Sequence, residues 1–87
     1  MKAAIAALAF SSDSQTLAIG DLEGEVRLWN VKTGQALGTP IRHGYAIRKI
    51  EFTSDGRKLL IAGGRGGSIY GEACLWDVAS NVRLGLL

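Results

Sequence analysis

The chain of 87 residues contains one cysteine, one histidine and one proline. Because Cys74 has no second cysteine to pair with, an intrachain disulfide is excluded. Cys74 and His43 together fall short of the set of ligands that a zinc site requires. A single histidine also cannot supply the cluster of acids, bases or metal ligands on which a hydrolytic site depends. The sequence therefore predicts a protein that is not an enzyme and that has no metal and no cofactor.

Long apolar runs and clusters of like charge are also absent. The apolar segment Ala3–Phe10 has eight residues and no cleavage site of small residues after it, whereas a membrane span needs about 20 apolar residues. Lysine and arginine are spread along the chain and form no run suited to a nucleic-acid backbone. We therefore expect a soluble, cytoplasmic protein with no membrane or nucleic-acid partner, and one unpaired cysteine agrees with a reducing compartment.

The small size of the chain limits its core. A domain this small buries only about 60% of the surface that its unfolded chain exposes, and small scaffolds usually need disulfides, a metal or oligomerisation for stability. The first two are excluded by the residue counts. Oligomerisation remains as the expected source of stability.

One strand-like segment occurs twice: Val26–Val31 returns as Ala73–Val78, each with a central tryptophan. An earlier apolar pattern is also repeated, because Ile5, Leu8 and Phe10 have the same spacing as three apolar residues that lie 42 positions later. Those three are Ile47, Ile50 and Phe52. A repeat of this kind is the first feature to interpret in any sequence.

Polar turns follow the repeated strands at equivalent places. Ser11–Ser14 and Thr53–Gly56 contain the short Asp and Ser side chains that bond to neighbouring backbone amides in tight turns. The two aspartates are thus expected to be structural and not a catalytic pair. Gly34 and Asn81 also occupy equivalent places, and these two residue types best tolerate a left-handed backbone. The loop Gly63–Gly71 is five residues longer than its first counterpart.

Each copy therefore contains four short antiparallel strands in about 40 to 45 residues, the period of a propeller blade. The chain resembles two repeats of the WD-repeat β-propeller family. The resemblance rests on Phe10 with Asp13, Leu28–Asn30, Phe52 with Asp55 and Gly56, and Leu75–Asp77, while Thr33–Pro40 is similar to bacterial members. It implies an all-β fold of two four-stranded antiparallel blades, the first over residues 1–44 and the second over residues 45–87.

Several positions depart from the family pattern. The Gly-His pair of the family is Arg42-His43 here, and its strand Ser or Thr is Ile19 and Ile61. Its Asp before the Trp is Glu23 in the first copy and Tyr70 in the second. The side-chain network with which many members lock each blade is expected to be missing, so that packing must hold the blades.

Two blades cannot cover their own outer faces, and bare apolar faces of that size are avoided by soluble monomers. We therefore expect a homo-oligomeric ring in which the second blade packs on the first blade of the next chain. Four chains, giving eight blades, are favoured over three chains, giving six. The alternative is a fragment of a larger WD-repeat propeller, natural or engineered, with no independent function.

The candidate binding residues form a basic rim predicted to accept acidic peptides, acidic proteins or anions: Arg42, His43, Tyr45, Arg48 and Arg65. Arg65 lies in the glycine-rich loop Gly63–Gly67, whose simpler interpretation is an elongated hairpin loop. His43 has a simpler interpretation too, as a structural loop residue. Cys74 is expected to be an inert strand residue, and both tryptophans are expected in the core. The predicted function is a non-enzymatic protein-interaction scaffold.

Overall fold

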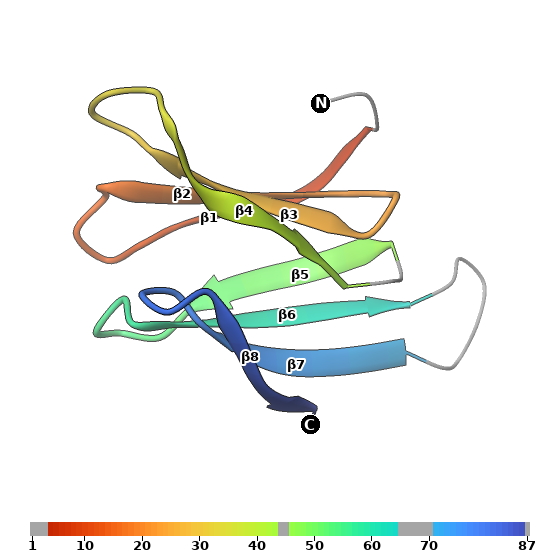
Figure 1. The fold of residues 1–87 in the computed structure, drawn as a ribbon. Helices are drawn as coiled ribbons and strands as arrows, with labels where there is room; N and C mark the ends of the chain where they lie inside the picture. The colour runs from red at the N-terminus through yellow and green to blue at the C-terminus, as the bar shows by residue number, and fades with distance from the viewer. Residues whose placement is uncertain (1–3, 44–45, 65–70, 87) are drawn as a thin grey trace.

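The computed structural model describes residues 4–43, 46–64 and 71–86, which form two four-stranded antiparallel sheets. The first sheet contains β1 (Ile5–Phe10), β2 (Thr16–Asp21), β3 (Glu25–Asn30) and β4 (Ala36–Arg42). The second contains β5 (Ile47–Phe52), β6 (Lys58–Gly64), β7 (Gly71–Asp77) and β8 (Val82–Leu86). In both, the strands are ordered as they occur along the chain, and the two sheets are stacked (Figure 1). The predicted all-β fold of two four-stranded sheets is confirmed.

The first strand pair of each sheet has the same register and the same irregularity. In β1 the register shifts between Ile5 and Ala7, and in β5 it shifts between Ile47 and Lys49 at the equivalent place. Each shift is a β-bulge, which bends a strand and re-aims the extra side chain. The irregularity is therefore present at the same place in both copies.

Equivalent turns are held by equivalent side chains. The Ser11 hydroxyl donates to Asp13 Oδ1 at 2.5 Å, and the Thr53 hydroxyl donates to Asp55 Oδ1 at 2.6 Å. Each carboxylate also accepts a backbone N–H two residues further on, at 2.9 Å. The structural role predicted for both aspartates is confirmed.

The turns after β3 and β7 use a left-handed residue, as expected. Gly34 has a φ of 75° and Asn81 a φ of 58°. In these turns Asn30 Oδ1 accepts two backbone N–H groups and Asp77 Oδ2 accepts the N–H and the hydroxyl of Ser80.

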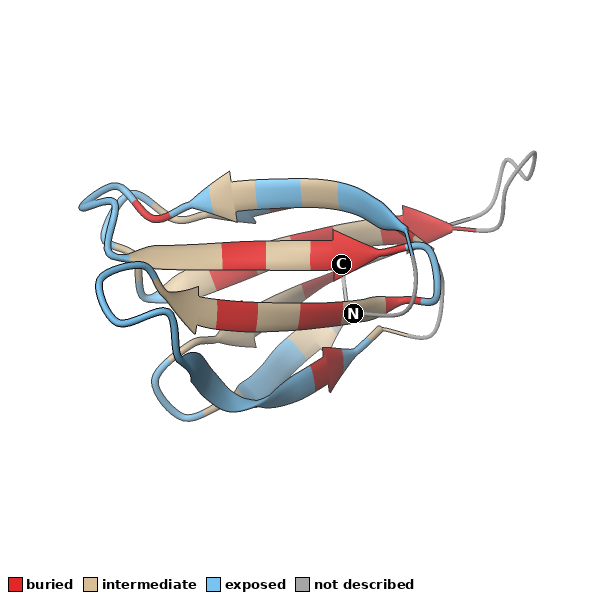
Figure 2. Cartoon of the chain, turned by 90° about the horizontal axis from the view of Figure 1, so that it is seen from above, coloured by how far each residue is buried: buried red, intermediate tan, exposed pale blue. Residues whose placement is uncertain are grey.

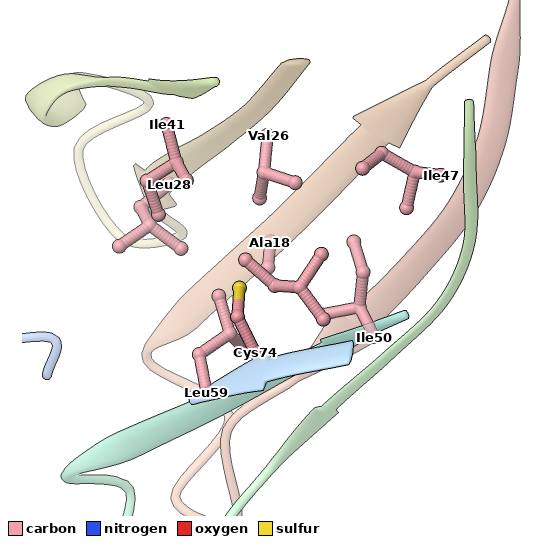
Figure 3. Close-up of a cluster of buried hydrophobic side chains, with 9 residues drawn as sticks. Ala18, Val26, Leu28, Ile41, Ile47, Ile50, Leu59 and Cys74 are labelled. Carbon is pink, nitrogen blue, oxygen red and sulfur yellow. The ribbon is translucent and has the colours of Figure 1, made fainter. Parts of the chain in front are cut away.

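The core lies between the sheets. Its buried members come from both, and Figure 3 shows the labelled ones directed toward one another from the facing strands. They are Ala18, Val26, Leu28, Ile41, Ile47, Ile50, Leu59, Ile61 and Cys74. Along the middle strands, buried positions alternate with intermediate ones, while pale blue predominates on the turns and on β4 (Figure 2). This alternation is the period-2 pattern of strands with two different faces.

The two tryptophans differ in their surroundings. Trp76 packs against the core cluster, as predicted. Trp29 pairs with Leu17 and lies on the opposite face of the first sheet, outside that cluster. The expectation of a core position is therefore met for Trp76 alone, because no neighbouring sheet within the described part of this chain covers the face that carries Trp29.

Candidate interaction surfaces

The face of the first sheet that points away from the second sheet is apolar and open. The paired positions of β1, β2 and β3 place six side chains on it: Leu8, Phe10, Leu17, Ile19, Arg27 and Trp29. Leu8 is 56% exposed and Phe10 is 54% exposed. We call this set the outer face of the first sheet. Large exposed apolar patches on soluble proteins mark interaction sites, whether for a protein, a membrane or an apolar ligand.

The equivalent face of the second sheet is covered by the first sheet. Ile50 and Phe52 occupy the places of Leu8 and Phe10 in the repeat, and Ile50 is only 5% exposed because it packs against the first sheet. The open face of one sheet is thus the repeat equivalent of the buried face of the other.

The outer face of the second sheet is more mixed. The pairing of β5, β6 and β7 places six side chains there: Lys49, Glu51, Leu60, Ala62, Ala73 and Leu75. Lys49 Nζ and Glu51 Oε1 form an ion pair of 3.2 Å, with both side chains more than half exposed. The other four members of this face are half-buried and apolar. Together the two outer faces leave each end of the stack able to receive another sheet.

The predicted basic rim is described in part. Arg42 ends β4, His43 follows it, and Arg48 is in β5. Tyr45 and Arg65 lie outside the described residues. Arg42 and His43 thus lie at the start of the connection from β4 to β5, and Arg48 is the second residue of β5.

His43 connects the two sheets. Its backbone N–H donates to the carbonyl of Gly24 at 2.7 Å, while its ring Nε2 lies 3.2 Å from the carbonyl oxygen of Glu72. Because a carbonyl only accepts, Nε2 is the donor in this contact. The thiol Sγ of Cys74 lies 3.6 Å from Nδ1. The half-buried His43 ring thus has structural contacts with β7.

The two arginines of the rim differ in setting. The side chain of Arg42 is 83% exposed and its Nη2 lies 3.6 Å from Glu25 Oε2. That carboxylate also accepts from Arg27 Nε at 2.8 Å. Arg48 falls in the register shift of β5 and is exposed. Surface ion pairs of the Arg42–Glu25 type contribute little to stability.

A hydrogen-bond relay joins the two sheets, and it was not predicted from the sequence. Trp76 Nε1 donates to Asn81 Oδ1 at 3.2 Å, and Asn81 Nδ2 donates to Thr39 Oγ1 of the first sheet at 2.8 Å. The expectation that packing alone holds the blades is thus incomplete. One feature of the sequence could have indicated this relay. Gly34 and Asn81 occupy equivalent places after a tryptophan, and only asparagine has a side chain that can form hydrogen bonds.

The counterpart of this relay in the first sheet is incomplete. Trp29 Nε1 is buried and is without a hydrogen-bond partner among the residues that the structure describes. Gly34, at the place of Asn81, has no side chain to accept from it. An unpaired buried donor costs about 1–3 kcal/mol of stability.

A pocket of about 280 Å³ lies between the sheets beside the relay. Its walls are Leu28, Leu37 and Gly38 of the first sheet with Val78, Ala79 and Asn81 of the turn between β7 and β8. The walls are mainly apolar, so the pocket is suited to an apolar side chain rather than to a charged ligand.

Cys74 is buried, and burial raises the pKa of its thiol above the ordinary value. The thiol is therefore protonated at neutral pH. Within residues 4–43, 46–64 and 71–86 no group of three or more potential metal ligands is gathered. Over the same ranges, no helical segment has the length and hydrophobicity that a bilayer crossing requires.

Comparison with known proteins places this geometry in a family. The model of the Vps8 beta-propeller family matches residues 1–80. Human apoptotic protease-activating factor 1 is 42% identical over 64 residues, which is 64% of this chain and 5% of that protein. Periodic tryptophan protein 2 of Arabidopsis thaliana is 35% identical over 68 residues, which is 78% of this chain and 7% of that protein. The chain thus spans a small part of the relatives that it matches.

Two solved structures show the same fold. The structure of U3-55K superposes on the whole chain with a TM-score of 0.84 at 18% identity, and the match covers 27% of that protein. The crystal structure of the RRP9 WD40 repeats gives a TM-score of 0.84 at 18% identity, with the match covering 26% of it. With its two stacked four-stranded sheets and tryptophan-centred repeats, the chain belongs to the WD-repeat β-propeller family.

Proposed function

We propose that this chain is a non-enzymatic protein-interaction scaffold, a two-blade unit that assembles with further copies of itself into a closed β-propeller. The first blade covers residues 1–44 and the second covers residues 45–87. Each junction between copies joins the second sheet of one chain to the first sheet of the next. Such a head-to-tail contact closes into a ring when its rotation permits.

One observation carries this proposal: Leu8 is 56% exposed, whereas its repeat equivalent Ile50 is 5% exposed. The sequence supplies the same kind of apolar face twice, and only one copy finds a covering sheet within the described part of the chain. Repeat proteins bury a continuous core by stacking, and about three or more units are needed for stability.

Four copies are our preferred ring, because they give eight blades and the family resemblance favours seven or eight. Three copies would give six, and known propellers close with about four to eight blades. An odd number cannot be built from two-blade chains. A ring of identical chains would also present each loop several times, which raises avidity for a repeated partner.

The proposal is tested by native mass spectrometry and light scattering on the purified chain at low micromolar concentration. A single species with four times the mass of one chain is expected, and three times that mass would replace the tetramer with the trimer. A well-folded monomer at that concentration would overturn self-assembly.

A second candidate is that the chain is a fragment of a larger propeller, natural or engineered, without independent function. The small share of each relative that the chain covers, 5% and 7% for the two described above, supports it. In that case the outer faces are covered by blades of the same polypeptide. Flanking coding sequence with further tryptophan-centred repeats would discriminate it from the ring.

We further propose that the basic rim (Arg42, His43, Tyr45, Arg48 and Arg65) binds acidic peptides or proteins. The exposed Arg42 and the bulged Arg48 support this role, because a guanidinium can hold a carboxylate with two parallel hydrogen bonds. The contacts of His43 with Glu72 and Cys74 suit a residue that positions this connection.

The rim is tested by pull-down of acidic partners with the double variant Arg48→Glu and Arg65→Glu. Charge reversal is expected to abolish capture. Lys32→Glu with Arg57→Glu is a matched control, because both residues are exposed and lie outside the rim. Unchanged capture by the Arg48/Arg65 variant would count decisively against the rim.

A further inference from the structure

We infer that the contact between two copies of the chain (the seam between copies) has the same strand register as the contact between the two sheets of one chain (the internal seam). The seam between copies is the looser of the two. The reason is that three residues of the internal seam, Ala7, Ala9 and Gly20, are replaced there by Lys49, Glu51 and Ala62. This inference rests on the self-assembly proposed above. The occupant of each outer face is a second copy of this chain, docked with the outer face of its first sheet on the outer face of the second sheet.

The register argument comes from strand pairing. Ala7 pairs with Gly20 and Lys49 pairs with Ala62, 42 positions later in both strands. Leu8 likewise pairs with Ile19, and Ile50 with Ile61. Since the bulge before these pairs is also repeated, the outer face of the second sheet is the direct counterpart of the face with which the first sheet contacts it. The outer face of the first sheet can therefore pack on the outer face of the second sheet in the register that the two inner faces have.

The internal seam needs a glycine at one point of closest approach. A Cβ added to Gly20 would lie 2.9 Å from Ile47 Cβ and 2.9 Å from Ile50 Cδ1, closer than such atoms approach. At the seam between copies, Ala62 has this Cβ, and the residues that face it are Ile5 and Leu8. The sheets must therefore stand further apart there, or these two exposed side chains must move.

Charge adds to the difference. Ala7 and Ala9 pack against the core at the internal seam. Their counterparts Lys49 and Glu51 are charged and form an exposed ion pair. Docking removes water from this pair, and the cost of desolvating two charges commonly exceeds their mutual attraction. Their flexible stems let the charged groups reach water at the edge of the seam, so docking is weakened and not prevented.

These differences give the ring a built-in place to open. The chain's own two sheets stay together, while copies separate at the Lys49–Glu51 edge as concentration falls. Assembly is thus expected to be reversible and dependent on protein concentration.

The register is tested with the double variant Ile5→Cys and Ala62→Cys, oxidised with glutathione disulfide. At the internal equivalents, Ile47 and Gly20, a Cβ added to the glycine would lie 2.9 Å from Ile47 Cβ, and a modest widening brings the pair into the range of about 3.5–4.5 Å that a disulfide needs. Covalent oligomers up to the full ring are expected on denaturing gels. Each single-cysteine variant is the control for pairing with Cys74, and a double variant that crosslinks no better than they do would overturn the register.

The weaker contact between copies is tested with the triple variant Lys49→Ala, Glu51→Ala and Ala62→Gly. This variant gives the outer face of the second sheet the residues of the internal seam. Analytical ultracentrifugation is expected to give a dissociation constant lower by about tenfold or more. Because a glycine in a strand weakens it, the Lys49→Ala/Glu51→Ala variant is measured as well. The control is Lys32→Ala with Glu23→Ala, which removes one charge of each sign from exposed turns.

The outcomes separate the two proposals. If the wild type forms oligomers and neither seam variant associates more tightly, the proposal of a looser seam is overturned, while the proposal of self-assembly is supported. A monomeric wild type with assembling seam variants would overturn self-assembly of the natural chain and support the seam. Monomers throughout would overturn both.

Discussion

The Asn81 side chain accepts the indole N–H of Trp76 and donates to Thr39 of the other sheet. Asn81 has a φ of 58°, which few residues other than glycine and asparagine adopt at low cost. One residue thereby completes the turn between β7 and β8, pairs with the indole N–H and joins the two sheets.

Loss of this relay is expected to destabilise the chain. Asn81→Gly keeps the left-handed backbone but removes the acceptor of Trp76 and the bond to Thr39, which should lower the free energy of unfolding by about 1–3 kcal/mol. Urea denaturation followed by tryptophan fluorescence measures the change. Thr39→Val removes only the bond across the seam and should cost less. Equal stability of Asn81→Gly and wild type would contradict the relay.

The missing relay of the first sheet should be restorable. Gly34 has a φ of 75° and no atom within 4 Å of an added Cβ, so asparagine fits there. Gly34→Asn is expected to raise the free energy of unfolding by about 1 kcal/mol, because it gives the buried Trp29 Nε1 an acceptor. Gly34→Ala, which adds a side chain without an acceptor to a left-handed position, should lower it. If alanine stabilises as much as asparagine, the hydrogen bond is not the cause.

Assembly should depend on the outer face of the first sheet. Leu8→Glu places a charge on that face and is expected to convert oligomers to monomers, as light scattering would show, with little change in circular dichroism. Leu22→Glu is a matched control, because Leu22 is 57% exposed but lies in the turn between β2 and β3. An oligomer that survives Leu8→Glu and not Leu22→Glu would place the contact elsewhere.

Acid should weaken the turns. Hydrogen bonds from Ser11 to Asp13 and from Thr53 to Asp55, with those from backbone N–H groups, lower the pKa of both carboxyls below the ordinary value of 3.8. A carboxyl whose pKa is lowered by folding stabilises the folded chain above its unfolded pKa and loses that contribution as pH falls through the folded pKa.

We therefore expect the urea midpoint to fall as pH decreases from about 5 toward about 2. The variant Ser11→Ala with Thr53→Ala should be less stable at neutral pH and should show a smaller dependence on acid. An acid dependence as steep as that of the wild type would exclude these two turns as its source.

The repeat and the local features of each copy could be predicted from the order of residues alone. The apolar spacing of β1 and β5, the Asp turns and the left-handed Gly34 and Asn81 are settled by neighbours within a few residues, and each was predicted. The rim residues were also named from the sequence, although two of the five lie outside the described residues.

The stacking of the two sheets decides which face of each sheet is covered. Leu8 and Ile50 are alike in sequence context, yet one is exposed and the other buried, because the second sheet stacks on one side of the first. The seam bonds of Asn81 and His43 were likewise hidden, since they join residues 42, 29 and 31 positions apart. Burial and long-range hydrogen bonds depend on how two sheets stack, and no local pattern carries that information.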